Sequence, residues 1–448
     1  RHVAACERPE RTQRRRLLAL LKHNAKTDIG QRHSFSTIHD VDTFRQRVPI
    51  NRWEDISDEM GQLISGNMTL RIADSTCFFA TSSGTTGKRK LIPITPGFVE
   101  EFRSSRRVWT RTLISELPGI VRGKLLTMHS PGTEDLAPGI RCGAITAALS
   151  TLDPDHDRPF EAVPAAVYFV EDFATRYFLC LRFALCEPVS LVAAVNPSTL
   201  MLFAQTFASR WQQLQTAIAT GDLGADLVIG DSWRVRLQQR ATPMPEVAQA
   251  IGDSAKANGG VPRLVDVWPR LCGLCCWKAG SARWYLPQLE KHYGKVPILD
   301  YGYVATEGSF AVPLSVNGAA SVLTPQAHFL EFMPDDDVAS CLDGSKPTLM
   351  LHQLDAGKRY RVVITNGAGL YRYDINDVVE VVGYWRHSPE VVFVQKGGSM
   401  SSLTGEKLGE SPVVQAFEVA MAKLNFDILG FVVSPLFPHH NAGITTPH

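Results

Sequence analysis

Residues 81–95 read TSSGTTGKRKLIPIT, a stretch of glycines, hydroxyl side chains and cations. Gly84 and Gly87 leave backbone amides uncovered, and Lys88 begins a short basic run that supplies further hydrogen-bond donors. Exposed amides and cations bind phosphate oxygens, so the stretch favours a polyphosphate site. It is not a Walker A loop, because only GTTGK is present and no Ser or Thr follows the lysine. On spacing alone, a Ser/Thr/Gly turn with a solvated basic tail is an equal alternative.

An amphipathic helix is predicted to follow this bend. Thr95 suits the N-cap and Pro96 the first helical position, and apolar residues then recur at steps of three and four. The same signals predict a long helix after Asn196 and Pro197. Short runs of β-branched or apolar residues predict strands, which are residues 125–128, 191–195, 297–299 and 361–365. Strands of this length between helices indicate α/β layers with buried sheets.

The pattern changes near the end of the sequence. Residues 378–383 and 391–396 predict two strands of an antiparallel hairpin. The loop that follows, residues 396–402, contains two glycines and three serines and marks the predicted domain border. The expected fold class is therefore α/β, with a large N-terminal domain of β-sheets layered with helices over residues 1–396 and a small α+β piece over residues 397–448.

Composition excludes several classes of protein. Among 448 residues, 46 Lys and Arg balance 45 Asp and Glu, which leaves a net charge of +1 and no basic footprint for nucleic acid. A hydrophobic share of 44% is typical of a folded globular protein, and no run is apolar enough to span a membrane. Nine scattered cysteines do not indicate a disulfide framework. We therefore expect a cytoplasmic protein without nucleic-acid or membrane partners; the sequence does not specify its oligomeric state.

Four motifs resemble those of a known enzyme family. SSGTTGxxK is similar to the phosphate-binding signature of the adenylate-forming superfamily of acyl-CoA ligases and luciferase-like enzymes, and the continuation RKLIPIT resembles the GH-three (Gretchen Hagen) auxin-responsive acyl-acid amido synthetases. The other three follow in the family's order, and they are YGYVATEG (301–308), YRYDINDVV (371–379) and TGEKLGE (404–410). The chain is identified as a member of this family on these motifs.

The resemblance implies the adenylate-forming enzyme fold. It makes residues 1–396 an N-terminal adenylation domain and puts a hinge at Lys396 and Gly397. Relatives carry a C-terminal domain of about a hundred residues, an ordinary domain size. Only residues 397–448 are present here, so the C-terminal domain is expected to be incomplete.

The resemblance also implies a site for ATP. Tyr303 would pack against the adenine, Thr306 would contact the α-phosphate, and Asp377 would accept hydrogen bonds from both ribose hydroxyls, as a carboxylate can. Asn376 stands where the superfamily usually has glycine, and asparagine tolerates the left-handed backbone that such a turn requires. The phosphate contacts implied are Ser82, Ser83, Gly84, Thr85, Thr86, Gly87 and Lys88.

The implied catalytic residues are Thr306, Glu307 and Lys407. Glu307 would bind Mg²⁺, which prefers hard oxygen donors, and Lys407 would meet the carboxylate and α-phosphate. Each has a plain alternative: Glu307 as an exposed loop acid, Lys407 as a surface ion pair, and Asp377 as a turn residue between two strands. Tyr371 and Arg372 either pack under the nucleotide or fill a strand.

The activity that the resemblance implies is a two-step ATP-dependent ligation. A carboxylic acid and ATP with Mg²⁺ give an acyl-adenylate, and an amine, expected to be an amino acid, then attacks the acyl carbon. The amine acceptor follows from the resemblance alone. An acyl-CoA ligase and a non-catalytic protein that binds a nucleotide or small acid remain the alternatives.

Overall fold

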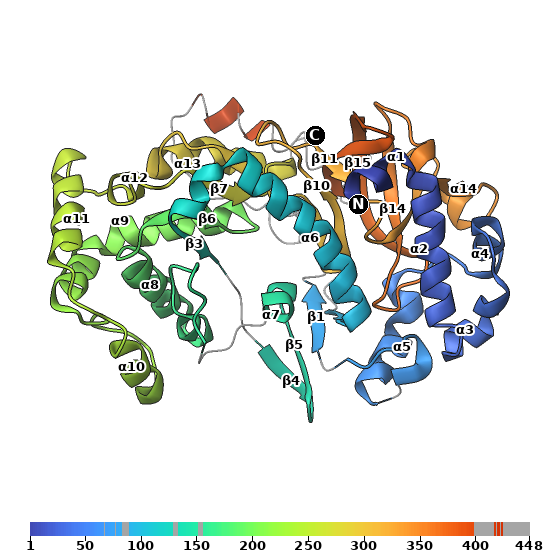
Figure 1. The fold of residues 1–448 in the computed structure, drawn as a ribbon, viewed down its shortest axis with the longest axis horizontal. Helices are drawn as coiled ribbons and strands as arrows, with labels where there is room; N and C mark the ends of the chain where they lie inside the picture. The colour runs from blue at the N-terminus through green and yellow to red at the C-terminus, as the bar shows by residue number, and fades with distance from the viewer. Residues whose placement is uncertain are drawn as a thin grey trace, which may run out of the picture.

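Three β-sheets form the framework of the protein in the computed structural model (Figure 1). The structure describes residues 1–66, 68–76, 78–82, 89–128, 133–150, 156–397 and, beyond these, 416, 417, 419–421 and 423. Within this part of the chain, the largest sheet has eight strands in the order β13-β12-β14-β15-β16-β11-β10-β9, all antiparallel to their neighbours. Its strands are β9 Tyr303–Ala305, β10 Gly308–Val312, β11 Ser321–Leu323, β12 Phe329–Pro334, β13 Leu349–Met350, β14 Arg359–Thr365, β15 Tyr373–Trp385 and β16 Ser388–Lys396.

A second sheet is parallel throughout, in the order β3-β6-β7-β8. Its central strands are wholly buried, because helices cover it as is usual for parallel sheets. Phe178, Phe203 and Trp268 belong to the core that packs around this sheet. Its strands are β3 Lys124–Thr127, β6 Val189–Ala193, β7 Gly273–Cys276 and β8 Ile298–Asp300.

The third sheet holds the two ends of the glycine-rich bend. Its order is β2-β1-β5-β4, with β1 antiparallel to β2 and parallel to β5. Phe79 and Ile92 of this sheet share a core with Phe310 and Ile364 of the eight-stranded sheet, so the two sheets pack as one body. Its strands are β1 Phe78–Ser82, β2 Lys90–Pro93, β4 Thr133–Ala137 and β5 Ile140–Gly143.

Both helices predicted with N-caps are confirmed. In α6, Pro96–Glu116, the side chain of Thr95 accepts from the Phe98 N–H at 3.0 Å, and α9, Pro197–Thr220, is capped by Asn196. Figure 1 shows α6 running between the group α8–α13 on the left and the group α1–α5 on the right. The other helices are α1 His2–Glu7, α2 Pro9–His23, α3 Asp28–Arg32, α4 Val41–Arg47, α5 Trp53–Ile64, α7 Ile145–Ser150, α8 Phe173–Ala184, α10 Asp231–Gln238, α11 Pro245–Ala257, α12 Leu264–Val267, α13 Leu286–Tyr293 and α14 Val338–Leu342.

The α/β class and the predicted strands are confirmed. The four internal strands appear as β3, β6, β8 and β14, and the predicted hairpin is the antiparallel pair β15–β16. The large sheet ends at Lys396, while nearly all of the small piece predicted over 397–448 lies outside the described residues. The border itself stays a prediction. Among the described helices, none combines the length and the apolarity needed to cross a bilayer.

Arg372 belongs to a buried network of ion pairs and hydrogen bonds. Its Nε donates to Glu331 Oε2 at 3.1 Å, and its Nη1 donates to the Val48 carbonyl at 2.8 Å. Arg45 Nε of α4 donates to the other oxygen of Glu331 at 3.1 Å. The carboxylate of Glu331 on β12 is thus compensated from two sides, and the network joins the N-terminal helices to the sheet. Arg372 lies just before β15 with a left-handed φ of 45°, so the alternative that it fills a strand is wrong, and packing under a nucleotide stays a prediction.

We expect Arg372→Met to lower the free energy of unfolding by about 3 kcal/mol, because it leaves a buried carboxylate short of one cation. Urea denaturation measures the change. Arg359→Met is the matched control, since Arg359 forms an ion pair with Glu380 at 2.9 Å but is more than half exposed, and it should cost no more than about 0.5 kcal/mol. Equal losses in both variants would contradict this account of the network.

Candidate active site

The base of the glycine-rich bend lies against β15. Ser82 at the end of β1 pairs with Lys90 at the start of β2, so the bend leaves and rejoins the sheet at one place. Lys90 Nζ donates to Tyr373 Oη at 3.0 Å, and Tyr373 begins β15 four residues before Asp377. The predicted phosphate contacts Ser83, Gly84, Thr85, Thr86, Gly87 and Lys88 lie outside the described residues.

Asp377 is a strand residue whose carboxylate is buried. It lies within β15, directly opposite Lys396 of β16, so the alternative of a turn residue between two strands is wrong. Tyr303 Oη donates to its Oδ2 at 2.9 Å, and the ammonium of Lys396 forms an ion pair with its Oδ1. Burial raises the pKa of Asp377, and the attraction of Lys396 offsets part of that rise. Tyr303 itself stacks on Phe310, with ring centroids 4.5 Å apart.

The backbone beside Asp377 has the conformation that the sequence predicted. Asn376 adopts a left-handed φ of 61°, as expected for asparagine at a glycine position. Its side chain donates to the Gly397 carbonyl, and its own carbonyl accepts from the Gly397 N–H at 2.6 Å. A Cβ at Gly397 would lie 2.5 Å from Asn376 Oδ1, so a larger residue at this position of the predicted hinge would have to displace the Asn376 side chain. Whether Lys396 and Gly397 act as a hinge stays a prediction.

Glu307 is buried, which rules out the alternative of an exposed loop acid. It lies with the half-buried Thr306 in the turn between β9 and β10, and only 5% of Glu307 is exposed. Burial raises the pKa of Glu307, the positive charge of Lys396 opposes the rise, and Asp377 adds to it. Lys90 also lowers this pKa. The base of the glycine-rich bend, the Glu307 turn and the Asp377 strand therefore lie close together. Lys396 is close enough to interact with both acids, and Lys90 with Glu307.

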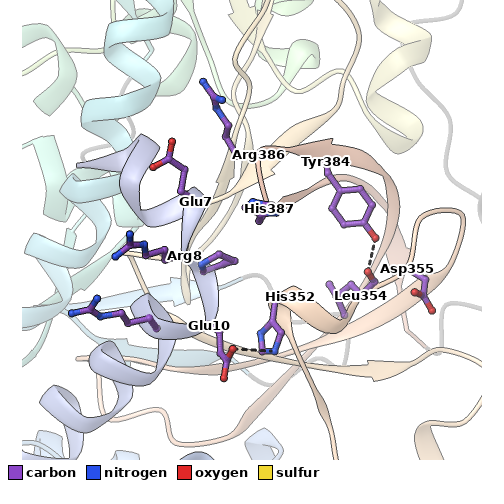
Figure 2. Close-up of a pocket in the computed structure, with 11 residues that line it drawn as sticks. Glu7, Arg8, Glu10, His352, Leu354, Asp355, Tyr384, Arg386 and His387 are labelled. Atoms are coloured by element: carbon purple, nitrogen blue, oxygen red, sulfur yellow. Dashed lines mark hydrogen bonds and ion pairs between the residues drawn. The ribbon is translucent and has the colours of Figure 1, made fainter.

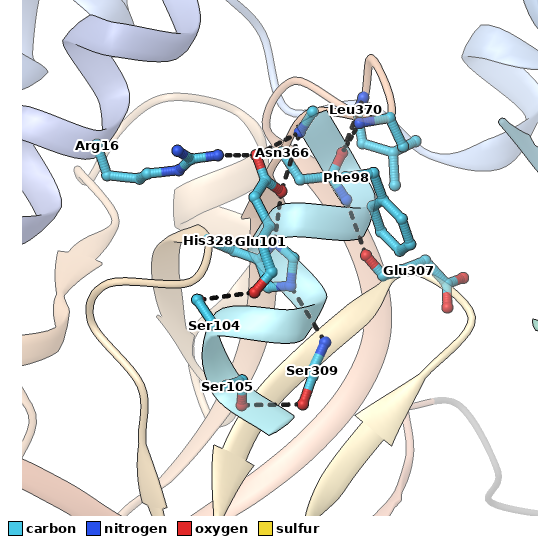
Figure 3. Close-up of polar contacts among 12 residues, drawn as sticks. Arg16, Phe98, Glu101, Ser104, Ser105, Glu307, Ser309, His328, Asn366 and Leu370 are labelled. Carbon is cyan, nitrogen blue, oxygen red and sulfur yellow. Dashed lines mark hydrogen bonds and ion pairs between the residues drawn. The ribbon is translucent and has the colours of Figure 1, made fainter. Parts of the chain in front are cut away.

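Residues that sequence reasoning missed hold the Glu307 turn from behind (Figure 3). Asn366 Nδ2 donates to the Glu307 carbonyl at 2.8 Å, while Figure 3 shows the Glu307 carboxylate directed away from this contact. Glu101 of α6 and His328 are also buried here. The sequence held one usable signal, because Glu101 lies on the apolar face of α6 beside Phe98, where an acid is unusual.

The donor set fits a Mg²⁺ ion bound largely through phosphates. Mg²⁺ commonly takes one or two carboxylates from a protein and keeps other oxygen ligands from water or substrate. Glu307 is an oxygen donor in the right region. Across the described ranges, no group of three or more His, Cys, Asp or Glu could hold a metal ion on its own. A Mg²⁺ ion at Glu307 would therefore depend on the phosphates of a nucleotide.

An open hollow of about 840 Å³ lies elsewhere, between the start of α2 and the β15–β16 turn (Figure 2). Its wall is charged, and His352 forms an ion pair with Glu10 there at 3.8 Å. Tyr384 donates to the Leu354 carbonyl on the same wall. The residues predicted to bind nucleotide do not line it.

The loss of Lys396 should destabilise the protein more at high pH than at low pH. A buried acid with a raised pKa favours the folded state at low pH and loses that contribution as the pH rises through the raised pKa. Burial acts to lower the pKa of Lys396, but Asp377 and Glu307 raise it overall, so the lysine stays charged and relieves both acids. We expect Lys396→Met to cost about 1–2 kcal/mol more near pH 8 than near pH 5, by urea denaturation.

Lys358→Met is the matched control for this experiment. Lys358 pairs with Asp355 at 2.9 Å on the surface, where both side chains are mostly exposed. Its replacement should leave the pH dependence unchanged. A Lys396→Met cost that is the same at both pH values would contradict the charge compensation described for Asp377 and Glu307.

Comparisons with known proteins identify relatives of this chain. The family model for the GH3 family N-terminal domain matches residues 1–298, and that for the GH3 family central domain matches residues 321–396. The probable indole-3-acetic acid-amido synthetase GH3.2 of Oryza sativa subsp. japonica is 26% identical, over 94% of this chain and 74% of its own length. The indole-3-acetic acid-amido synthetase GH3.2 of Arabidopsis thaliana is 24% identical, over 92% and 78%.

A solved structure has the same fold. The GH3.15 acyl acid amido synthetase superposes with a TM-score of 0.82 at 22% sequence identity, over 94% of this chain and 74% of that one. The same protein in complex with 2,4-DB gives a TM-score of 0.81.

Proposed function

Because this chain belongs to the GH3 family, we propose that it is an ATP-dependent acyl-acid amido synthetase. In the first step a carboxylate oxygen attacks the α-phosphorus of ATP, which gives an acyl-adenylate and pyrophosphate. In the second step an amine, which we take to be an amino acid, attacks the acyl carbon and releases AMP. The observation that carries the proposal is the meeting of the loop base at Lys90, the Glu307 turn and Asp377 in one place.

The charges of the site suit adenylation. A carboxylate that approaches a triphosphate is repelled, so the reaction needs cations and hydrogen-bond donors close to the phosphates. Lys90 and Lys396 are ammonium groups beside the two buried acids. Glu307 would hold a Mg²⁺ ion, which supplies charge neutralisation to the phosphates when bound. Thr306, in the same turn, would donate to the α-phosphate.

Asp377 is suited to hold the ribose. Its two oxygens already accept from Tyr303 and pair with Lys396, so the site presents an acceptor in a defined orientation. We propose that the ribose hydroxyls exchange with these partners and that the ring of Tyr303 contacts the adenine. The loop contacts Ser82 to Lys88, the catalytic lysine Lys407, and the hinge at Lys396 and Gly397 belong to the proposal on the strength of the motif resemblance.

The wider assignment is also a proposal. We assign residues 1–396 to the adenylation domain and residues 397–448 to the hinge and C-terminal domain, and we place the protein in the cytoplasm. The relatives are named for indole-3-acetic acid, and a solved relative binds 2,4-DB. Both ligands are carboxylic acids, which supports this substrate class for the present chain without choosing a member of it.

The first test is acid-dependent exchange of pyrophosphate into ATP, with a panel of carboxylic acids. We expect Glu307→Gln and Asp377→Ala each to slow the exchange by about 100-fold or more, because each removes a contact to the reacting nucleotide. Glu380→Gln is the control, since this acid lies on β15 with Asp377 but pairs with Arg359 at 2.9 Å on the surface. Near-normal exchange in both site variants would refute the assignment of these residues.

The second test separates the amine acceptor from coenzyme A. Purified protein is incubated with the best acid of the panel and ATP, and then with a mixture of amino acids or with coenzyme A. We expect an acyl-amino acid by mass spectrometry and no thioester. A thioester product would make the protein an acyl-CoA ligase, and the absence of exchange with every acid would favour a protein that binds without turnover.

A further inference from the structure

A buried histidine and a buried glutamate lie directly behind the Glu307 turn. His328 Nε2 accepts from the Ser309 N–H at 3.1 Å, and Ser309 follows Glu307 by two residues. Since Nε2 is an acceptor, Nδ1 carries the hydrogen and donates to Glu101 Oε2, 2.8 Å away. His328 has no exposed surface and Glu101 only 3%. The turn is therefore anchored through an imidazole to a carboxylate on α6.

The same carboxylate holds the other side of the turn. Glu101 accepts from the Gly367 N–H at 2.9 Å and pairs with Arg16 of α2. The residue before Gly367 is Asn366, which donates to the Glu307 carbonyl at 2.8 Å (Figure 3). Backbone groups on both sides of the turn are thus fixed by one connected set of hydrogen bonds.

Two glycines are required for these contacts. A Cβ at Gly308 would lie 2.6 Å from His328 Nε2, so only glycine lets the ring approach the turn. A Cβ at Gly367 would lie 2.8 Å from the Phe98 N and 3.0 Å from Glu101 Oε1. The absence of side chains at both positions brings α6 against the turn.

The helix α6, which carries Glu101, directly follows the β1–β2 hairpin that holds the ends of the glycine-rich bend. β2 ends at Pro93, and α6 starts at Pro96 with Thr95 as its cap. Thr95 Oγ1 also donates to the Gly367 carbonyl at 2.8 Å. The base of the bend, α6 and the Glu307 turn are consequently linked by short, buried contacts.

We propose that Glu101 and His328 are positioning residues, which fix the Thr306–Glu307 turn against α6 so that the turn can engage the triphosphate. The inference rests on the proposed function and adds to it the pair of residues that orients the turn carrying Thr306 and Glu307. Neither side chain is placed to touch the substrate. Their effect passes through the Ser309 N–H and through Gly367.

Two substitutions of His328 test its two hydrogen bonds separately, the one with the Ser309 N–H and the one with Glu101. Glutamine can present an oxygen close to the position of Nε2 and so keep the acceptor for Ser309. Asparagine can present an amide close to the position of Nδ1 and so keep the donor to Glu101 while it loses Ser309. The pair differs by one methylene and is equally polar. A purely structural role predicts similar damage in both, whereas positioning of the turn predicts damage mainly in His328→Asn.

The experiment measures ATP binding by calorimetry, with Mg²⁺ and with EDTA, beside acid-dependent pyrophosphate exchange and thermal melting. We expect His328→Asn to lose about 10-fold or more of the gain in ATP affinity that Mg²⁺ gives, and a similar factor in the kcat of exchange. His328→Gln should stay within about 3-fold of the wild type. Glu101→Met is the second site variant, used if His328→Asn does not fold. It removes the acceptor for both the Gly367 N–H and His328 Nδ1 and should also lose the Mg²⁺ response.

Arg182→Gln is the control for loss of a buried polar group. Arg182 of α8 is 1% exposed and donates to the Asp222 carbonyl at 2.8 Å, away from the turn. It should lower the melting temperature and leave both the Mg²⁺ response and the kcat unchanged. A His328→Asn variant that behaves like this control would overturn the positioning role while the proposed function stands. A wild type that neither exchanges pyrophosphate nor binds ATP would end both.

Discussion

Burying two carboxylates side by side is costly, because each loses its hydration and repels the other. Lys396 of β16 attracts both Glu307 and Asp377, and Lys90 of β2 adds a weaker attraction at Glu307. The rest of the site depends on this compensation. The β1–β2 hairpin brings Lys90, and the pairing of β15 with β16 brings Lys396 opposite Asp377. An acid that is kept desolvated beside a cation interacts strongly with an incoming charged ligand.

Local rules predicted much of the fold. The caps at Thr95 and Asn196, the runs that became β3, β6, β8 and β14, and the β15–β16 hairpin all depend on neighbours in sequence, and each is confirmed. The left-handed conformation of Asn376 was expected from the motif resemblance, since asparagine stands there at a usual glycine position. The order of strands in the eight-stranded sheet was beyond such rules, since it depends on pairings between distant segments such as β11 with β16.

The motifs predicted the site residues, but they did not predict the residues that hold those site residues in place. Glu307 and Asp377 lie in recognisable stretches, but their burial follows from packing that no local pattern specifies. His328, Asn366 and Gly367 come from two connections far apart in sequence, and only the folded chain brings them to Glu307. Arg372 is the opposite case, because it lies in a motif but its side chain belongs to the buried Glu331 network. Motifs identify groups that ligands contact; the groups that hold them are set by tertiary structure.

The register that puts Asp377 opposite Lys396 has a thermodynamic consequence. Under the proposed function, a ribose bound through both oxygens of this carboxylate would compete with the Lys396 ammonium, so its affinity would be reduced by the free energy of the weakened ion pair. A change at Gly397 that drew Lys396 away would then strengthen ribose binding. By linkage, ribose binding would promote that change by the same factor. Occupancy of the proposed ribose site and the position of Lys396 at the end of β16 would thereby be energetically coupled.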